Sequence, residues 1–186
     1  MAMLGFEPGF AIAGASEQVE KVMLKIAELN GMGLTVPETT VKVIYKKLCN
    51  EFMTPSIDVF KRINNEKTQM KFENYGLNET QTKPITLIMP YLQKIEKLIM
   101  KNCGLCDQAA ALLIKASLGK QSQIHYIDLT GIEMGKAFIE SLTQVLTKRP
   151  NCLKEIIMAD LKPLVSIGYL LDALMLCKSL QYLDLN

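Results

Sequence analysis

The sequence predicts an α/β solenoid, in which short parallel strands alternate with helices, preceded by a small all-α subdomain. An apolar triplet, spaced as positions one, four and six, recurs through the C-terminal two thirds of the chain. A helical stretch follows each triplet that has sequence after it. Before residue 67 the triplet is absent, and apolar residues follow helical spacing instead. These observations together indicate two regions of different architecture.

The triplets keep a nearly constant period. Their first positions are residues 67, 95, 124, 153 and 180. A fixed period of about 28 residues is typical of a solenoid, because one unit cannot bury its own apolar face and must stack on the next. The triplets are Lys67, Met70 and Phe72 (with lysine at the first place); Ile95, Leu98 and Met100; Ile124, Ile127 and Leu129; Leu153, Ile156 and Met158; Leu180, Leu183 and Leu185.

Residues 1–66 are predicted to form an N-terminal all-α helical cap, with residues 1–15 as a loose tail. Apolar residues at helical spacing predict three helices here. Pro37 suits the first turn of the second helix. The three expected helices cover residues 16–30, 37–52 and 54–63.

From residue 67 onward each triplet predicts a short strand, because its last two members alternate as one face of a strand requires. The strands are expected to be parallel, with the helices in a second layer outside the sheet. In the first unit, Pro84 could begin a helix and Pro90 would break it. The other expected helices cover residues 107–118, 133–148 and 161–178.

Residues 95–105, Ile-Glu-Lys-Leu-Ile-Met-Lys-Asn-Cys-Gly-Leu, resemble the leucine-rich repeat family and its ribonuclease-inhibitor-like subclass. The resemblance covers residues 67–186, about four and a half units, and implies a parallel sheet on a concave face with helices on the convex face. It also implies that the concave face binds proteins. The chain departs from the family pattern at the ninth place, with Tyr75, Ile132 and Leu161, and at the eleventh, with Pro163. Because a solenoid end normally needs a polar cap, we expect the array to continue, or a partner to cap it, beyond residue 186.

Positions three and five of each strand point away from the core, onto the concave sheet. Each position forms a column of neighbouring side chains, because adjacent strands lie about 4.8 Å apart. Tyrosine and apolar residues in these columns favour a binding surface. The alternative is a plain solvated sheet face, and the lone histidine, His125, gives no metal site. The predicted partner-binding residues are Lys97, Ile99, Tyr126, Asp128, Glu155, Ile157, Tyr182 and Asp184.

Composition narrows the function classes. Twenty-one Lys and Arg against nineteen Asp and Glu give a net charge of +2, which argues against a nucleic-acid partner. No window approaches the roughly 20 apolar residues of a membrane span. Five cysteines, an odd number, indicate reduced thiols and a cytoplasmic location, with the nucleus left open. Cys103 and Cys106 have the spacing of a redox or zinc pair, but core packing is favoured over either.

No catalytic motif is recognisable in the sequence, and one histidine leaves little room for acid–base catalysis. We therefore predict a non-catalytic protein-interaction scaffold that needs no cofactor or metal. Two alternatives stay open. One is a regulator of an enzyme, such as a GTPase-activating or ubiquitin-ligase-associated repeat protein, and the other is a structural subunit of a large assembly.

Overall fold

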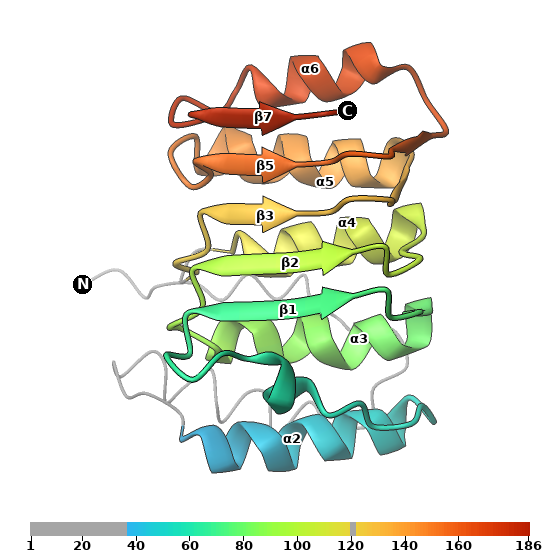
Figure 1. Ribbon diagram of the computed structural model, residues 1–186, viewed down its shortest axis with the longest axis vertical. Coiled ribbons are helices and arrows are strands. Elements are labelled where there is room, and N and C mark those ends of the chain that lie inside the picture. The colour runs from blue at the N-terminus through green and yellow to red at the C-terminus, as the bar shows by residue number, and fades with distance from the viewer. Residues whose placement is uncertain (1–36, 120–121) are drawn as a thin grey trace, which may run out of the picture. The chain divides into compact units, whose positions relative to one another are not determined.

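The computed structural model describes residues 37–119 and 122–186 (Figure 1). The chain divides into two units, Met1–Ser56 and Ile57–Asn186. This boundary precedes the expected one after residue 66. The expected helix over residues 16–30 and the expected tail lie outside the described residues.

Helix α2 (Glu38–Glu51) confirms the helix expected over residues 37–52. Pro37 takes its N-cap position, and one face of the helix is buried through Val41, Ile44 and Leu48.

The α-helix expected over residues 54–63 is wrong. The structure has a single 3-10 turn, η1 (Val59–Arg62), which belongs to the second unit. Ile63 is extended and makes an antiparallel bridge with Met70. The backbone at Ile63 therefore pairs with the start of the first strand and cannot continue a helix.

The second unit contains a five-stranded parallel sheet in the order β1-β2-β3-β5-β7, so the predicted mixed α/β class with a parallel sheet is confirmed. The five triplets lie in register, since Met70 pairs with Leu98, Leu98 with Ile127, Ile127 with Ile156, and Ile156 with Leu183. The strands are β1 (Gln69–Glu73), β2 (Lys97–Lys101), β3 (Tyr126–Asp128), β5 (Glu155–Ile157) and β7 (Tyr182–Asp184).

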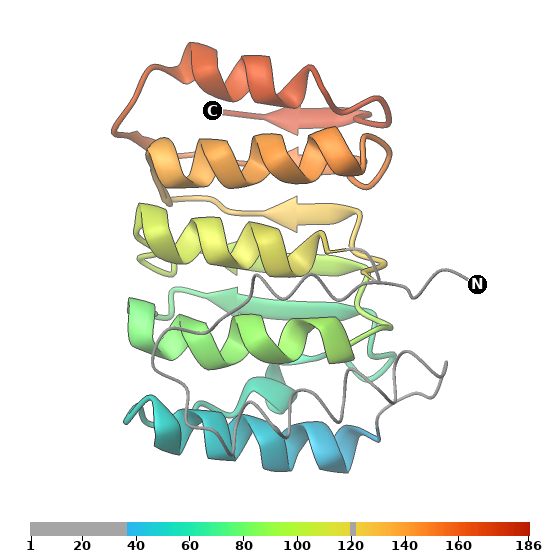
Figure 2. The same cartoon turned by 180° about the vertical axis from the view of Figure 1, so that it is seen from behind.

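Among the described residues, four α-helices cover one face of the sheet and no α-helix covers the other (Figures 1 and 2). We call the uncovered side the open sheet face. A second, two-stranded parallel sheet, not expected from the sequence, joins β4 (Glu133–Met134) to β6 (Lys162–Pro163). The helices are α3 (Glu79–Ile88), followed by the 3-10 turn η2 (Met89–Tyr91), α4 (Asp107–Ser117), α5 (Lys136–Lys148) and α6 (Ile167–Leu174).

Three helices begin elsewhere than expected. Helix α5 begins at Lys136 and not at residue 133, because Glu133 and Met134 form β4. Asn78 and Gln81 form a reciprocal capping box that starts α3 ahead of Pro84, which therefore lies inside the helix. Helix α6 is shorter than residues 161–178, because Lys162 and Pro163 pair with β4 and Ser166 then caps the helix by accepting from the Gly168 N–H.

The core lies between the sheet and the helix layer. One face of α4 and of α5 is buried, including Leu113, Phe138 and Leu142. In α6 only Leu170, Ala173 and Leu174 are buried, whereas Met175, just after the helix, is 82% exposed. No helix in the described residues is long and apolar enough to span a membrane.

A residue with positive φ follows each of the first four strands of the large sheet, at the eighth place of the repeat. The N–H groups of these residues donate to carbonyl oxygens at or just after the end of the next strand, so the chain leaves the sheet with the same geometry each time. Asparagine, aspartate and glycine adopt this left-handed conformation most readily. At Gly131 a Cβ would also lie 2.6 Å from the Asn102 side-chain oxygen. The four residues are Asn74 (φ 50°), Asn102 (φ 51°), Gly131 (φ 78°) and Asp160 (φ 51°).

Two charged side chains join α4 and α5 at opposite ends. The Asp107 carboxylate accepts hydrogen bonds from the N–H groups of Gly135 (2.7 Å), Ala137 (3.0 Å) and Phe138 (3.0 Å), at the start of α5. At the other end, the Arg149 guanidinium donates to the carbonyl oxygens of Leu118 (2.8 Å) and Gly119, where α4 ends. Each contact places a charge against the helix-dipole end that it stabilises, so the two helices cap each other.

Candidate functional site: the open sheet face

The structure aligns the predicted partner-binding residues in two columns on the open sheet face. In one column Lys97 pairs with Tyr126, Tyr126 with Glu155, and Glu155 with Tyr182. In the other, in the same order of strands, the neighbours are Ile99, Asp128, Ile157 and Asp184. The strands of the sheet thus bring together eight residues from four separate segments of the chain.

Tyr126 occupies a central place in the first column. It is partly buried, and the Lys97 ammonium lies 5.2 Å from the centre of its ring, within cation–π range. Burial, with smaller contributions from the nearby Asp128 and Glu155, raises the pKa of its hydroxyl. The phenol therefore stays protonated around neutral pH and can donate a hydrogen bond to a partner.

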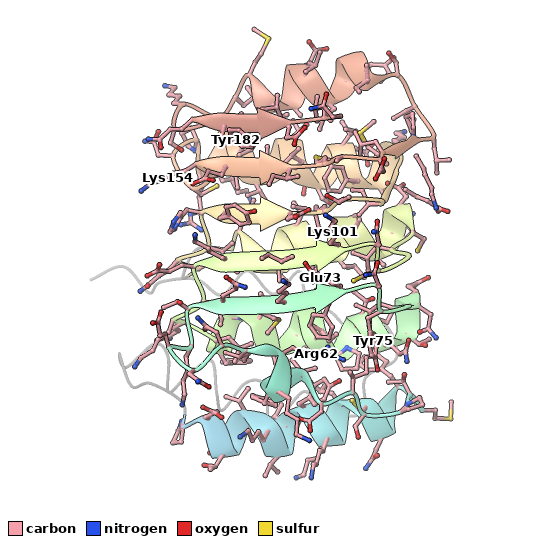
Figure 3. All side chains as sticks on the ribbon, in the orientation of Figure 1. Arg62, Glu73, Tyr75, Lys101, Lys154 and Tyr182 are labelled. Carbon is pink, nitrogen blue, oxygen red and sulfur yellow. The ribbon has the colours of Figure 1, made fainter. Side chains whose placement is uncertain are left out.

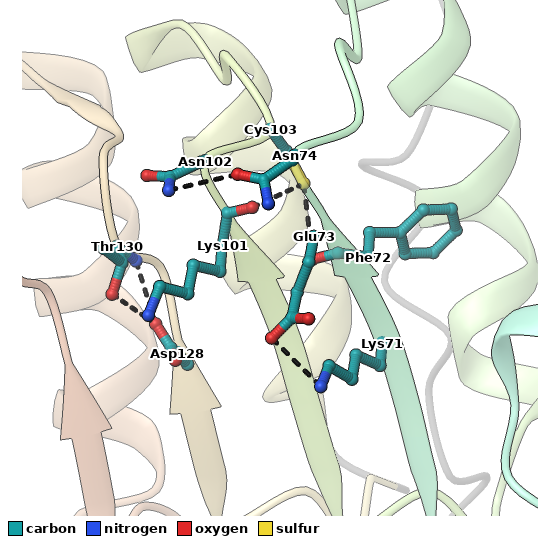
Figure 4. A network of polar contacts seen from close by, with 9 residues as sticks. All are labelled: Lys71, Phe72, Glu73, Asn74, Lys101, Asn102, Cys103, Asp128 and Thr130. Atoms are coloured by element: carbon teal, nitrogen blue, oxygen red, sulfur yellow. Dashed lines mark hydrogen bonds and ion pairs between the residues drawn. The ribbon is translucent and has the colours of Figure 1, made fainter.

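Asp128 differs from the expectation of an exposed contact residue. It is only 8% exposed, and its carboxylate accepts from the Thr130 hydroxyl (2.6 Å) and the Thr130 N–H (3.0 Å). Figure 4 shows this pair at the end of β3. Asp128 therefore holds the turn after the strand, and the partner-accessible part of its column is reduced to Ile99, Ile157 and Asp184.

The same region holds further polar contacts, both within a strand and between neighbouring repeats (Figure 4). Asn102 donates from its side-chain amide to that of Asn74 (3.3 Å), and Lys71 pairs with Glu73 (3.0 Å) along β1. These contacts restrict the backbone at the ends of β1 and β2, and with it the positions of the outward side chains there.

A depression at the β1 end of the open sheet face was not expected from the sequence. It has a volume of about 380 Å³ and is lined by residues 61–64 and by Gln69, Lys71 and Glu73 of β1. The Arg62 guanidinium carbon lies 5.0 Å from the ring centre of Tyr75 and 5.8 Å from that of Phe72. Figure 3 shows Arg62, Glu73 and Tyr75 on this side of the sheet. We call it the basic depression, because Lys61, Arg62 and Lys71 outnumber its single acid, Glu73.

The cysteines are all free thiols, and four of the five are buried. Cys103 donates to the carbonyl oxygens of Phe72 and Lys101, both at 3.5 Å, and burial raises the pKa of its thiol to about 11. Cys106, its partner in the sequence motif, is only partly buried and precedes α4. Cys103 thus packs in the core, as the sequence favoured.

We expect these environments to separate the thiols by reactivity. Only thiolate attacks a disulfide reagent, so at about pH 8 Cys106 should react first with Ellman's reagent, while Cys103 stays protected until the chain unfolds. The measurement is the number of fast-reacting thiols in the native chain, with Cys106→Ser as control. A fast phase that persists unchanged in this variant would contradict the assignment.

The raised pKa of Cys103 also makes the stability of the folded chain depend on pH. The folded chain holds the Cys103 proton more tightly than the unfolded chain, so this contribution is complete below about pH 9 and is lost as pH rises towards about 11.

Most of the exposed large apolar side chains of the described residues lie between residues 164 and 183. Leu183 is 38% exposed, whereas its register partner Ile156 is fully buried. The other exposed large aliphatic or aromatic side chains between residues 164 and 183 are Leu164, Ile167, Tyr169, Leu171, Met175, Leu176 and Tyr182.

No protein-family model matches this chain, and it matches neither a curated protein nor a solved structure. We therefore infer its function from the geometry of the open sheet face.

Proposed function

We propose that this chain is a non-catalytic protein-interaction module that binds a protein partner on the open sheet face. The observation that carries the proposal is the alignment of Tyr126, Tyr182, Ile99 and Ile157 in adjacent columns. Tyrosine is enriched at binding hot spots, and the partly exposed isoleucines add apolar area whose burial favours association. The charged neighbours Lys97 and Glu155 would supply orientation and specificity.

In this proposal the chain is a leucine-rich repeat solenoid of the ribonuclease-inhibitor-like subclass, with the open sheet as its concave face. Its support is the near-constant period of the apolar triplets together with their register in the sheet. The left-handed residue at the eighth place of each complete unit adds a second repeated feature. We further propose a cytoplasmic location, supported by five free thiols.

Site-specific cross-linking tests the surface. A benzoylphenylalanine placed at Tyr126 should cross-link a protein partner in extract of the source organism. The same group at Glu140, exposed on α5 in the helix layer, should not. A partner cross-linked only from Glu140 would move the binding surface to the helices.

Once that partner is identified, Tyr126→Ala should weaken its binding about tenfold, because a partly buried aromatic anchor is worth more than about 1 kcal/mol. Lys97→Glu should weaken it less, about threefold, since exposed charges contribute little. Isothermal titration measures both, and thermal unfolding confirms that each variant stays folded. Lys136→Glu, on the helix layer, is the matched control for the charge reversal. Unchanged affinity in both sheet variants would refute the proposal.

A further inference from the structure

We propose that the basic depression receives an acidic segment of the protein partner, with Arg62 making the charged contact. This inference rests on the proposed function, because the depression opens on the same sheet face. It adds the chemistry of the partner and the place where that chemistry is recognised.

The first argument is charge. Of the bases that line the depression, Lys61 lies 2.8 Å from Asp58 and Lys71 lies 3.0 Å from Glu73. Arg62 has no carboxylate within ion-pair distance in the part of the chain that the structure describes. Arg62 is therefore the base in the lining whose positive charge is available to pair with a ligand.

The second argument is preorganisation. The Arg62 guanidinium contacts two aromatic rings, those of Tyr75 and Phe72, which themselves pack edge to face with centres 6.0 Å apart. Ring contact holds a guanidinium in place while its N–H groups remain available, and their planar fork matches a carboxylate. An arginine that is already positioned loses less side-chain entropy on binding than a free one.

The third argument is continuity with the open sheet face. Gln69 and Glu73 of β1, which line the depression, pair with Lys97 and Lys101 of β2, respectively. These two lysines extend positive charge from the depression onto the sheet, and neither forms an ion pair within residues 37–119 and 122–186. A segment that fills the depression would thus lie beside the predicted contact residues.

The same geometry favours a carboxylate-bearing peptide over a nucleic acid. Glu96, just before β2, would repel a continuous phosphate backbone, whereas a peptide can place its acids to either side of it. Ile99 offers apolar contact between the two lysines of β2. The net charge of the chain is only +2, so the chain as a whole attracts polyanions little.

Fluorescence anisotropy of the full chain tests this with synthetic probes. A labelled peptide of alternating glutamate and glycine should bind more tightly than its lysine counterpart, and binding should weaken as NaCl rises from about 0.05 to 0.3 M. Arg62→Gln should weaken binding of the glutamate peptide about fivefold. Lys136→Gln, which removes an equal charge from the helix layer, should change it less than twofold.

A further variant separates positioning from charge. Tyr75→Leu keeps Arg62 but removes one of its rings, so affinity for the glutamate peptide should fall by about twofold. In that background Arg62→Gln should cost only about 2.5-fold instead of about fivefold, because Tyr75 acts only through Arg62. Thermal unfolding monitors the fold of each variant.

Three outcomes would overturn the inference: equal binding of the two peptides, equal effects of Arg62→Gln and Lys136→Gln, or tighter binding of single-stranded oligouridylate than of the glutamate peptide. If the peptide test fails, a cross-link from Tyr126 would still support the proposed function of the open sheet face. Conversely, glutamate-peptide binding without any Tyr126 cross-link would refute the sheet-face function but not the charge preference of the depression.

Discussion

Leu98→Ala should lower the free energy of unfolding by about 3 kcal/mol, because it removes a fully buried side chain from the second strand of the sheet and leaves a cavity. Leu98 lies between Met70 and Ile127 in the register and beneath the helix layer, so few movements can fill the space. Urea unfolding followed by circular dichroism measures the change.

The chain carries a matched control for this substitution. Leu183 occupies the same place in the fifth triplet but is 38% exposed, so Leu183→Ala should cost only about 1 kcal/mol. Equal losses at the two sites would contradict the burial that separates the last unit from the others.

Asp107→Ala should lower the free energy of unfolding by about 2 kcal/mol. The substitution removes the acceptor of three backbone N–H groups at the start of α5 and a negative charge at the positive end of its dipole. Asp107→Asn should lose about half as much, since one side-chain oxygen still accepts. Chemical denaturation of the three proteins measures the series.

Asp172→Ala is the control, because Asp172 is exposed on α6 and pairs with no base in the described residues. It should change stability by less than about 0.5 kcal/mol. A loss at Asp107 no larger than that at Asp172 would show that the bonds between α4 and α5 contribute nothing net. Gly135→Ala gives a further check, because its Cβ would lie 2.6 Å from the Asp107 carboxylate and should displace it.

The spacing of apolar residues was sufficient to predict the parallel sheet and its register. In the first four triplets, burial at positions four and six follows strand alternation and the repeat period, both of which are visible in the sequence. The left-handed turns could also have been found, since Asn74, Asn102, Gly131 and Asp160 recur with the period of the triplets, and all favour positive φ.

The basic depression could not have been predicted in this way. Arg62 and Tyr75 belong to no shared pattern, and they meet because Ile63 bridges to Met70 and places η1 beside β1. The bonds of Asp107 to α5 and of Arg149 to α4 likewise span about one repeat and depend on how the helices pack. At Asp128 the sequence pattern was misleading. Strand alternation predicted an exposed carboxylate, but this carboxylate accepts a hydrogen bond from the Thr130 hydroxyl.

The sequence by itself determined the repeat, the strand register and the residues that line the open sheet face, because periodic burial of apolar side chains dictates all three. Tertiary structure decided which of those residues are accessible, where the helices are capped, and where a positioned arginine meets the face. These features depend on contacts between polar groups of neighbouring units, and no local spacing encodes such contacts.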